Sequence, residues 1–122
     1  MSAIPYCADV LDRSVSLLQL PDVAKNVGLA VTKVHQMLRD RSLIAIRRDG
    51  VVGIPEAFFD DDGQILQRLP GLLSVLHDGG FTDEEILEWL FREDDSLPGA
   101  PIVAMRGDLA REVIRRAQAA AF

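Results

Sequence analysis

The sequence predicts a mainly α-helical protein with a small β-hairpin: a winged helix-turn-helix followed by a helical C-terminal region. Three observations support this fold class. Two short amphipathic helices joined by a glycine-containing turn are predicted between residues 20 and 40. A β-branched segment with an Asp-Gly step follows at residues 42–54, which is typical of a hairpin. Helical patterns then dominate residues 60–122, and a chain of 122 residues can bury a core of this size.

We expect residues 1–19 to form an N-terminal tail, because chain ends are usually mobile unless they are tied down. A short strand is predicted within this tail at residues 14–19. Cys7 is the single cysteine of the chain, which excludes an internal disulfide and fits a reducing cytoplasm. We expect it to be an ordinary tail thiol. The tail shows no secretion signal, and no apolar run approaches the roughly 20 residues that cross a bilayer, so no membrane contact is predicted.

Residues 20–59 are predicted to be the winged helix-turn-helix. The first helix begins at Leu20-Pro21, since proline suits the first helical position, and it ends at Gly28, a typical left-handed C-terminal residue. The second helix is predicted at residues 31–40. The apolar side chains expected to pack against the first helix are Val31, Val34, Met37 and Leu38. The polar side chains expected on the opposite face are Thr32, Lys33, Gln36 and Arg39.

The wing is predicted as two strands, at residues 43–46 and 51–54, joined by the turn at residues 48–50. This places Arg47 and Arg48 at the tip of the hairpin. Pro55 is expected to end the second strand because proline cannot donate to a β-ladder. A turn of helix or a loop at residues 56–59 is expected to anchor two phenylalanines in the core.

Three helices are predicted in residues 60–122. The first runs over residues 70–78, and the second begins at a capping box formed by Thr82 and Glu85 and ends near Arg92. The third runs over about residues 109–120, after a turn-rich loop at residues 93–102. Its inward side chains are expected to be Leu109, Val113, Ile114 and Ala117. In the second helix, Trp89 is expected to be a core or inter-helix anchor.

Charge is distributed unevenly along the chain. The net charge of the whole chain is −6, yet residues 20–59 carry six basic and four acidic side chains, whereas residues 60–122 carry six arginines and thirteen acids. The predicted winged helix-turn-helix is therefore the one basic part of an acidic protein. Contact with phosphates depends on local charge and not on the total, so the acidic balance does not exclude nucleic acid as a partner.

The sequence offers little for catalysis. It holds two histidines and one cysteine, and it lacks the common nucleophile, zinc-protease, phosphate-loop and dinucleotide motifs. The acidic loop at residues 60–63 lacks the spaced oxygens of a calcium-binding loop. His35 is predicted to be partly exposed and His77 to be structural, near a helix C-terminus. We therefore expect no enzyme activity, no cofactor and no metal.

DNA binding is the function that the pattern favours. A second helix of this length fits the major groove, where Thr32, Lys33 and Gln36 are the candidates for base contacts. Arg39 and Arg41 are predicted to contact flanking phosphates, and Arg47 and Arg48 at the tip of the wing are predicted to reach the backbone or the minor groove. The alternative is a protein-protein interaction module that docks a partner on the acidic helical region. No heptad pattern is present, so we expect a monomer.

Six segments carry a resemblance to a known family: residues 20–24 (LPDVA), 28–34 (GLAVTKV), 43–48 (LIAIRR), 69–80 (LPGLLSVLHDGG), 86–91 (ILEWLF) and 111–119 (REVIRRAQA). The chain resembles a small family of actinobacterial winged-helix DNA-binding proteins, one mycobacterial member of which is a serine/threonine-kinase substrate. The resemblance implies DNA binding without catalysis by a cytoplasmic, nucleoid-associated or regulatory protein. It also implies a serine/threonine protein kinase as a second partner. The hydroxyls available before Thr32 are Ser2, Ser14 and Ser16.

Overall fold

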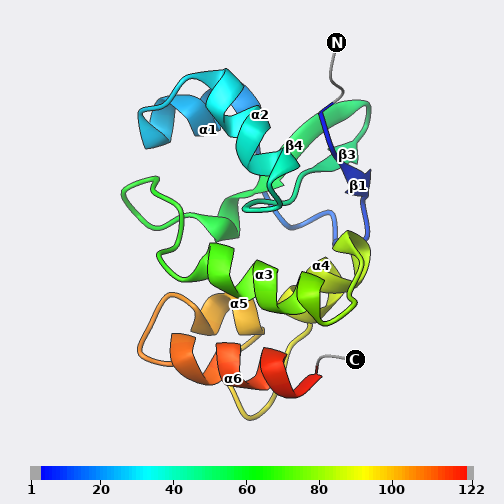
Figure 1. Ribbon diagram of the computed structural model, residues 1–122, viewed down its shortest axis with the longest axis vertical. Helices are drawn as coiled ribbons and strands as arrows, with labels where there is room; N and C mark the ends of the chain where they lie inside the picture. Colours follow the sequence, from blue (N-terminus) through cyan, green and yellow to red (C-terminus); the bar gives the residue numbers. More distant parts are fainter. Residues whose placement is uncertain (1–3, 121–122) are drawn as a thin grey trace.

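The computed structural model describes residues 4–120 and places a small sheet and two helices above a layer of further helices (Figure 1). The first half contains β1 (Cys7–Ala8), β2 (Leu17–Gln19), α1 (Leu20–Val27), α2 (Val31–Arg39), β3 (Ile46–Arg48), β4 (Val51–Pro55) and the 3-10 helix η1 (Glu56–Phe58). The second half contains α3 (Leu69–Asp78), α4 (Asp83–Phe91), α5 (Pro101–Ala104) and α6 (Ala110–Ala120). The predicted fold class, a winged helix-turn-helix followed by a helical region, is confirmed.

The two helices of the helix-turn-helix lie where the sequence predicts them. Pro21 stands in the first turn of α1, and Gly28 ends the helix in the left-handed conformation, with φ of 74°. In α2, Val34 and Leu38 are buried against the core, as their spacing indicates. Val31 differs from the prediction, because it is the first residue of α2 and remains 37% exposed at that end.

The sheet contains four strands in the order β1-β3-β4-β2. β1 runs parallel to β3, and β2 and β3 are both antiparallel to β4. The predicted strand within residues 14–19 therefore exists as β2. The expectation of a loose tail over residues 1–19 is wrong for its described part, because β1 pairs directly with the wing; residues 1–3 lie outside the described part.

Cys7 is a core residue of this sheet and not a tail thiol. Its side chain is buried, and its N–H donates to the Ala45 carbonyl at 2.9 Å. Burial, together with the nearby carboxylates of Glu84 and Asp83, raises the pKa of the Cys7 thiol from 9.0 to about 12.

We therefore expect Cys7 to resist iodoacetamide near pH 8 while the protein is folded. Burial blocks access, and the raised pKa leaves almost no thiolate to react. In denaturant the same thiol should be alkylated quickly, as mass spectrometry of timed samples would show. Equal rates in the folded and unfolded states would contradict this burial. Because its folded pKa is raised, the thiol contributes stability below about pH 9 that is lost above it.

The first strand and the turn of the hairpin differ from their predicted bounds. Leu43, Ile44 and Ala45 are buried but lie outside any strand, and β3 begins only at Ile46. The loop between the strands is two residues long, and both of them, Asp49 and Gly50, have positive φ, as a type I′ turn requires. The turn pairs Arg48 with Val51, so the arginines belong to β3 and not to the tip. Pro55 ends β4, as predicted.

The helical region follows the predicted order with one addition and one shift. The capping box is present, since the Thr82 hydroxyl accepts from the Glu85 N–H at 3.2 Å and Glu85 accepts from the Thr82 N–H at 2.9 Å. α5 is an additional short helix within and beyond the predicted loop, with Pro101 at its first turn. α6 begins at Ala110, which is buried, whereas Leu109 is 38% exposed and does not face inward.

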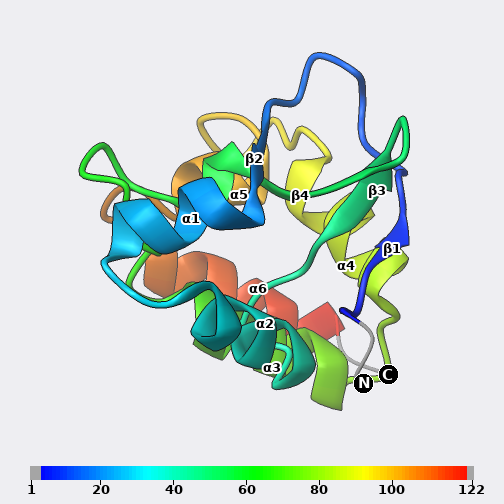
Figure 2. The ribbon, with the colours of Figure 1, turned by 90° about the horizontal axis from the view of Figure 1, so that it is seen from above.

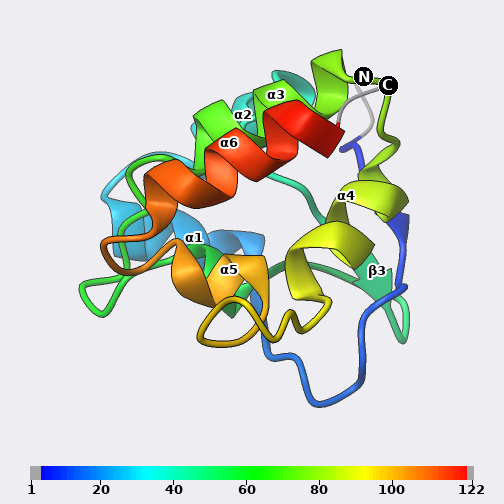
Figure 3. The ribbon, with the colours of Figure 1, turned by 90° about the horizontal axis from the view of Figure 1, so that it is seen from below.

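One core joins the two halves of the molecule. Phe58 and Phe59, carried by and just after η1, are almost completely buried, and the Phe58 ring lies 6.3 Å from that of Phe91 in α4. Trp89 is partly buried and packs against the same core. α3 lies beneath α2, with α6 against the other side of α3 (Figures 1 and 3). Within residues 4–120, no helix is long and apolar enough to span a membrane.

Candidate nucleic-acid interface

The solvent-facing side of α2 carries four of the predicted contact residues. Thr32, Lys33, Gln36 and Arg39 are all exposed, and α2 lies at the upper end of the molecule in Figure 1, on the side that faces the viewer in Figure 2. The N-cap residue of the helix, Ala30, provides no side-chain cap, and the first turn holds no acid. Its first backbone N–H groups therefore remain available to an anion, in a place that the helix dipole also favours.

The C-terminal half of this face is ordered by hydrogen bonds between side chains. Gln36 donates from Nε2 to Asp40 at 2.8 Å, and Arg39 donates to the Gln36 Oε1 at 3.0 Å. These contacts are exposed, so they orient the two side chains without removing them from solvent. The amide of Gln36 can exchange partners with a base edge, because each of its groups makes only one of these contacts.

Two further predicted contacts lie just outside α2. Arg41 follows the end of the helix, is exposed, and lies 3.0 Å from the His77 Nδ1 of α3 through its Nη1. Arg47 is exposed on β3 and lies over the ring of Tyr6, with 5.8 Å between its Cζ and the ring centroid. The sequence alone did not indicate a role for Tyr6, because it is the pairing of β1 with β3 that brings Tyr6 beside the wing.

Arg48 is the predicted contact that the structure places elsewhere. Its side chain is only 14% exposed and forms an ion pair with Asp9, with 2.6 Å between Nε and Oδ2. The same guanidinium donates to the backbone carbonyls of Val15 at 2.7 Å and Asp12 at 3.3 Å. Arg48 shares the inward side of β3 with Ile46, because side chains alternate along a strand. We therefore withdraw Arg48 as a DNA contact and assign it a structural role.

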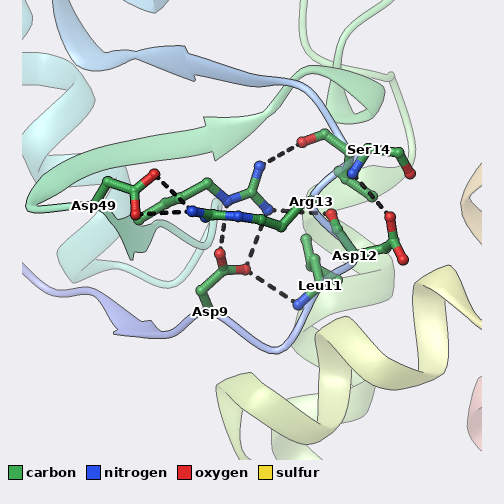
Figure 4. Close-up of polar contacts among 8 residues, drawn as sticks. Asp9, Leu11, Asp12, Arg13, Ser14 and Asp49 are labelled. Carbon is green, nitrogen blue, oxygen red and sulfur yellow. Dashed lines mark hydrogen bonds and ion pairs between the residues drawn. The ribbon is translucent and has the colours of Figure 1, made fainter.

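The segment that binds Arg48 is itself folded by local hydrogen bonds, as Figure 4 shows. Asp9 accepts from the Leu11 N–H at 3.2 Å, and Asp12 accepts from the Ser14 N–H at 2.8 Å. The hydrogen bond from Arg48 is the main reason why the pKa of Asp9 lies below its usual value of 3.8. Beside this cluster, Arg13 binds both carboxylate oxygens of Asp49 at the tip of the hairpin (Figure 4).

Ion pairing separates the basic residues into two groups. Arg13, Arg48, Arg106, Arg115 and Arg116 each pair with a carboxylate. By contrast, within residues 4–120 no ion pair involves Lys33, Arg39, Arg41 or Arg47. Most of the uncompensated positive charge of the winged helix-turn-helix thus lies on α2, just after it, and on the outer side of β3, and Lys25 of α1 is a further exposed cation without an ion pair among residues 4–120.

The acids of the helical region lie mainly in the loop at residues 60–62, in α4 and in the loop at residues 93–95. α1 and α2 lie at one end of the long axis, and α5 and α6 lie at the other (Figure 1). The acidic loop after η1 is also partly compensated, because Arg106 binds Asp61 and the Phe59 carbonyl. Among residues 4–120, no group of three or more potential metal ligands is assembled.

Two family models together match most of the chain. A family model described as "DNA-binding protein Rv2175c, wHTH domain" matches residues 3–59, and one described as "Rv2175c C-terminal domain of unknown function" matches residues 66–121. The first match includes the N-terminal segment that sequence reasoning treated as a tail, in agreement with the pairing of β1 and β3.

A relative and a solved structure resemble the whole chain. The DNA-binding protein Rv2175c of Mycobacterium tuberculosis is 45% identical over 134 residues, which cover 100% of this chain and 92% of the relative. The NMR structure of Rv2175c superposes with a TM-score of 0.86 at 45% identity, over 99% of this chain and 91% of that one.

Proposed function

Because the chain belongs to the family of the DNA-binding protein Rv2175c, we propose that it binds double-stranded DNA through α2 and the wing. The observation that carries this proposal is a cluster of cations without ion pairs on and beside α2 and on the wing: Lys33, Arg39, Arg41 and Arg47. All four are exposed, and each belongs to the helix-turn-helix or the wing. Unpaired cations gathered on one motif are the electrostatic footprint of a phosphate-binding surface.

In this proposal α2 enters the major groove with its N-terminal half toward the base edges. Thr32 and Lys33 lie in the first turn, where residues of a recognition helix reach bases, and Gln36 lies one turn later. Lysine contacts guanine and glutamine contacts adenine in the major groove. The open N–H groups at the start of α2 add an uncharged phosphate contact.

The remaining cations are proposed to contact the DNA backbone. Arg39 and Arg41 stand at the C-terminal end of α2, and Arg47 projects from the wing beside Tyr6. Such contacts fix the position of the protein on the duplex and carry little sequence information. Binding of this kind suits transcriptional regulation or nucleoid association in the cytoplasm, and the ratio of specific to nonspecific affinity would separate these two uses.

A fluorescence-polarisation titration at two salt concentrations tests the proposal. With three side-chain phosphate contacts, log K should fall against log salt with a slope of about −2.7. Gln36→Ala should reduce the preference between genomic and random duplexes while leaving this slope unchanged, because an adenine contact carries sequence information and no charge. A slope near zero for the wild type would contradict the proposed DNA interface.

One observation keeps a second function in view. The helical region is acidic and is matched by a domain family described as of unknown function. A protein partner docked there would leave DNA binding at α2 intact if both functions exist. If the chain fails to retard DNA at low salt but captures a specific protein, the interaction-module hypothesis gains and DNA binding fails.

Regulation by a serine/threonine kinase stays a prediction drawn from family resemblance. Ser14 and Ser16 are exposed, and Ser2 lies outside the described residues. Ser14 donates its N–H to the Asp12 carboxylate beside the Arg48 cluster. A phosphate on Ser14 would lie near Asp12, which repels it, and near Arg13 and Arg48, which attract it. Mass spectrometry after incubation with a kinase shows whether Ser14 or Ser16 is modified.

A further inference from the structure

The last turn of α2 ends in a conformation that normally takes glycine. The Ser42 N–H donates to the Met37 carbonyl at 2.9 Å and the Arg41 N–H to the Leu38 carbonyl at 3.2 Å, the paired bonds of a Schellman motif. Arg41 occupies its left-handed position with φ of 62°. A residue with a Cβ is disfavoured there relative to glycine. An arginine in a strained position suggests that its side chain has a use.

The side chain of Arg41 reaches out of the helix-turn-helix to the helical region. Its Nη1 lies 3.0 Å from the Nδ1 of His77, near the C-terminal end of α3. The His77 side chain is only 7% exposed, and its Nε2 lies 3.2 Å from the Oδ1 of Asp83, the first residue of α4. Arg41, His77 and Asp83 thus form a chain of contacts from the end of α2 through α3 to α4. The sequence alone did not connect α3 or α4 to the DNA site.

This geometry assigns the protonation of His77. Arginine has only donors, so Nδ1 must be the acceptor and the ring proton must lie on Nε2, toward Asp83. The Nε2 and Oδ1 atoms are shielded from solvent and make no aligned hydrogen bond, so their contact is electrostatic. Burial lowers the pKa of His77, and Arg41 acts in the same direction, while Asp83 and Asp78 oppose them. The ring is therefore kept neutral near pH 7, as an acceptor must be.

Arg41 is held in place without being neutralised. Its contact with a neutral ring uses one of its five N–H donors, and among residues 4–120 no carboxylate forms an ion pair with it. Arg48 is the opposite case, because Asp9 compensates its charge directly. An oriented cation with free donors is what a phosphate contact needs, since less side-chain entropy is lost on binding.

We propose that His77 is a positioning residue for DNA binding: its Nδ1 holds the Arg41 guanidinium at the end of α2, where the remaining donors meet a DNA phosphate. This inference rests on the proposed function and extends it to the helical region. In this arrangement the C-terminal domain touches no DNA, yet it sets the orientation of one contact on the recognition helix. Asp83 acts one step further away, by keeping the ring proton on Nε2.

A matched pair of substitutions tests the role of His77. Leucine and asparagine have nearly the same shape, but the asparagine amide oxygen stands close to the position of Nδ1 and can accept from Arg41. His77→Leu should weaken binding to a fluorescein-labelled mixed-sequence duplex about three- to tenfold, the effect of one net hydrogen bond. His77→Asn should bind nearly as the wild type does. Thermal melting monitored by circular dichroism confirms that each variant is folded at the assay temperature.

A double-mutant cycle separates positioning from general destabilisation. In an Arg41→Ala background, His77→Leu should have no further effect on DNA affinity, because the side chain it positions is absent. Arg41→Gly supplies a variant that keeps the fold, since glycine relieves the left-handed strain. It should melt at or above the temperature of Arg41→Ala and still bind DNA more weakly than the wild type.

The outcomes are distinguishable. Wild-type protein that fails to bind the duplex overturns the proposed function and this inference with it. Wild-type binding combined with equal affinities for His77→Leu and His77→Asn, or with additive effects in the cycle, overturns only the positioning role. Nitrogen-15 NMR of the free protein gives an answer independent of DNA: a proton on Nδ1 of His77 at pH 7 would also overturn it.

Discussion

Removal of Lys33 and Arg47 together is expected to weaken DNA binding more than any other pair of substitutions. Both side chains are exposed, and no ion pair involves either among residues 4–120, so alanine removes two charges without exposing an unpaired acid. Loss of the Arg47 phosphate contact should flatten the salt slope by about 0.9, and loss of the Lys33 base contact should lower the affinity further. Near 0.1 M salt we expect an affinity loss of about ten- to hundredfold, measured by fluorescence polarisation.

A charge-matched control separates local from total charge. Arg92 and Arg111 are exposed on the helical region, and no ion pair involves them within the described residues. Their double alanine variant changes the net charge by the same amount as the Lys33 and Arg47 pair. It should bind DNA nearly as the wild type does and keep its salt slope. Similar losses in both double variants would show that overall charge, and not the surface of α2 and the wing, governs binding.

Much of the fold could be predicted from local signals. Pro21 and Gly28 mark the ends of α1, and Thr82 with Glu85 marks the start of α4, because each residue type satisfies a specific backbone requirement. The strand β1 could not be found in this way. It is only two residues long, and it is stabilised by pairing with β3, some forty residues later. Long-range pairing leaves no periodic pattern in so short a segment.

The hairpin shows a second limit of sequence reasoning. The apolar segment Leu43-Ile44-Ala45 is buried in the core but does not belong to a strand. A buried loop of this kind has the same apolar sequence pattern as a buried strand. Because the predicted first strand ended too early, Arg47 and Arg48 were both placed at the tip and given the same role. In the structure, neighbouring residues of β3 face opposite sides, so the Arg47 side chain is exposed and the Arg48 side chain is largely buried against Asp9.

The candidate site was predictable where it lies on one helix and not where it depends on partners. Thr32, Lys33, Gln36 and Arg39 follow from helical spacing alone, and all four are exposed as expected. Three distant contacts had no local signal in the sequence: Tyr6 with Arg47, His77 with Arg41, and Asp9 with Arg48. Each distant partner changes what its arginine can do, by supporting, orienting or neutralising it.

Arg48 and Arg13 allow the effect of burial on an ion pair to be measured within one small cluster. Both arginines bind an aspartate, but the Arg48 and Asp9 side chains are 14% and 18% exposed, whereas those of Arg13 and Asp49 are 68% and 70% exposed. Arg48→Ala removes the charged partner of Asp9 and the donor to two backbone carbonyls, and should lower the free energy of unfolding by about 2–3 kcal/mol. Arg13→Ala should lower it by less than about 1 kcal/mol, because water screens an exposed pair. Urea unfolding at pH 7 measures both.

The pH dependence of stability tests the pairing of Arg48 with Asp9. Its folded pKa lies below the ordinary value of 3.8, so the stability it contributes is present above that value and is lost as the pH falls through the folded pKa. The difference in stability between wild type and Arg48→Ala should therefore shrink in acid. Asp12 contributes a smaller part of this change, because its pKa is lowered mainly by hydrogen bonds from Ser14 and only lastly by Arg48. Asp94 and Glu112, whose pKa values are lowered by groups other than Arg48, cancel in the difference.

DNA affinity then separates the two neighbouring arginines of β3. When Arg48→Ala is assayed at a temperature at which circular dichroism shows it to be folded, its affinity should stay close to that of the wild type. Arg47→Ala should show the reverse, with weaker binding and unchanged stability, because its side chain is exposed and the contact it makes with Tyr6 is also exposed. If Arg48→Ala lost affinity while remaining fully folded, the Asp9 pair would not neutralise Arg48, and the assignment of a structural role would fail.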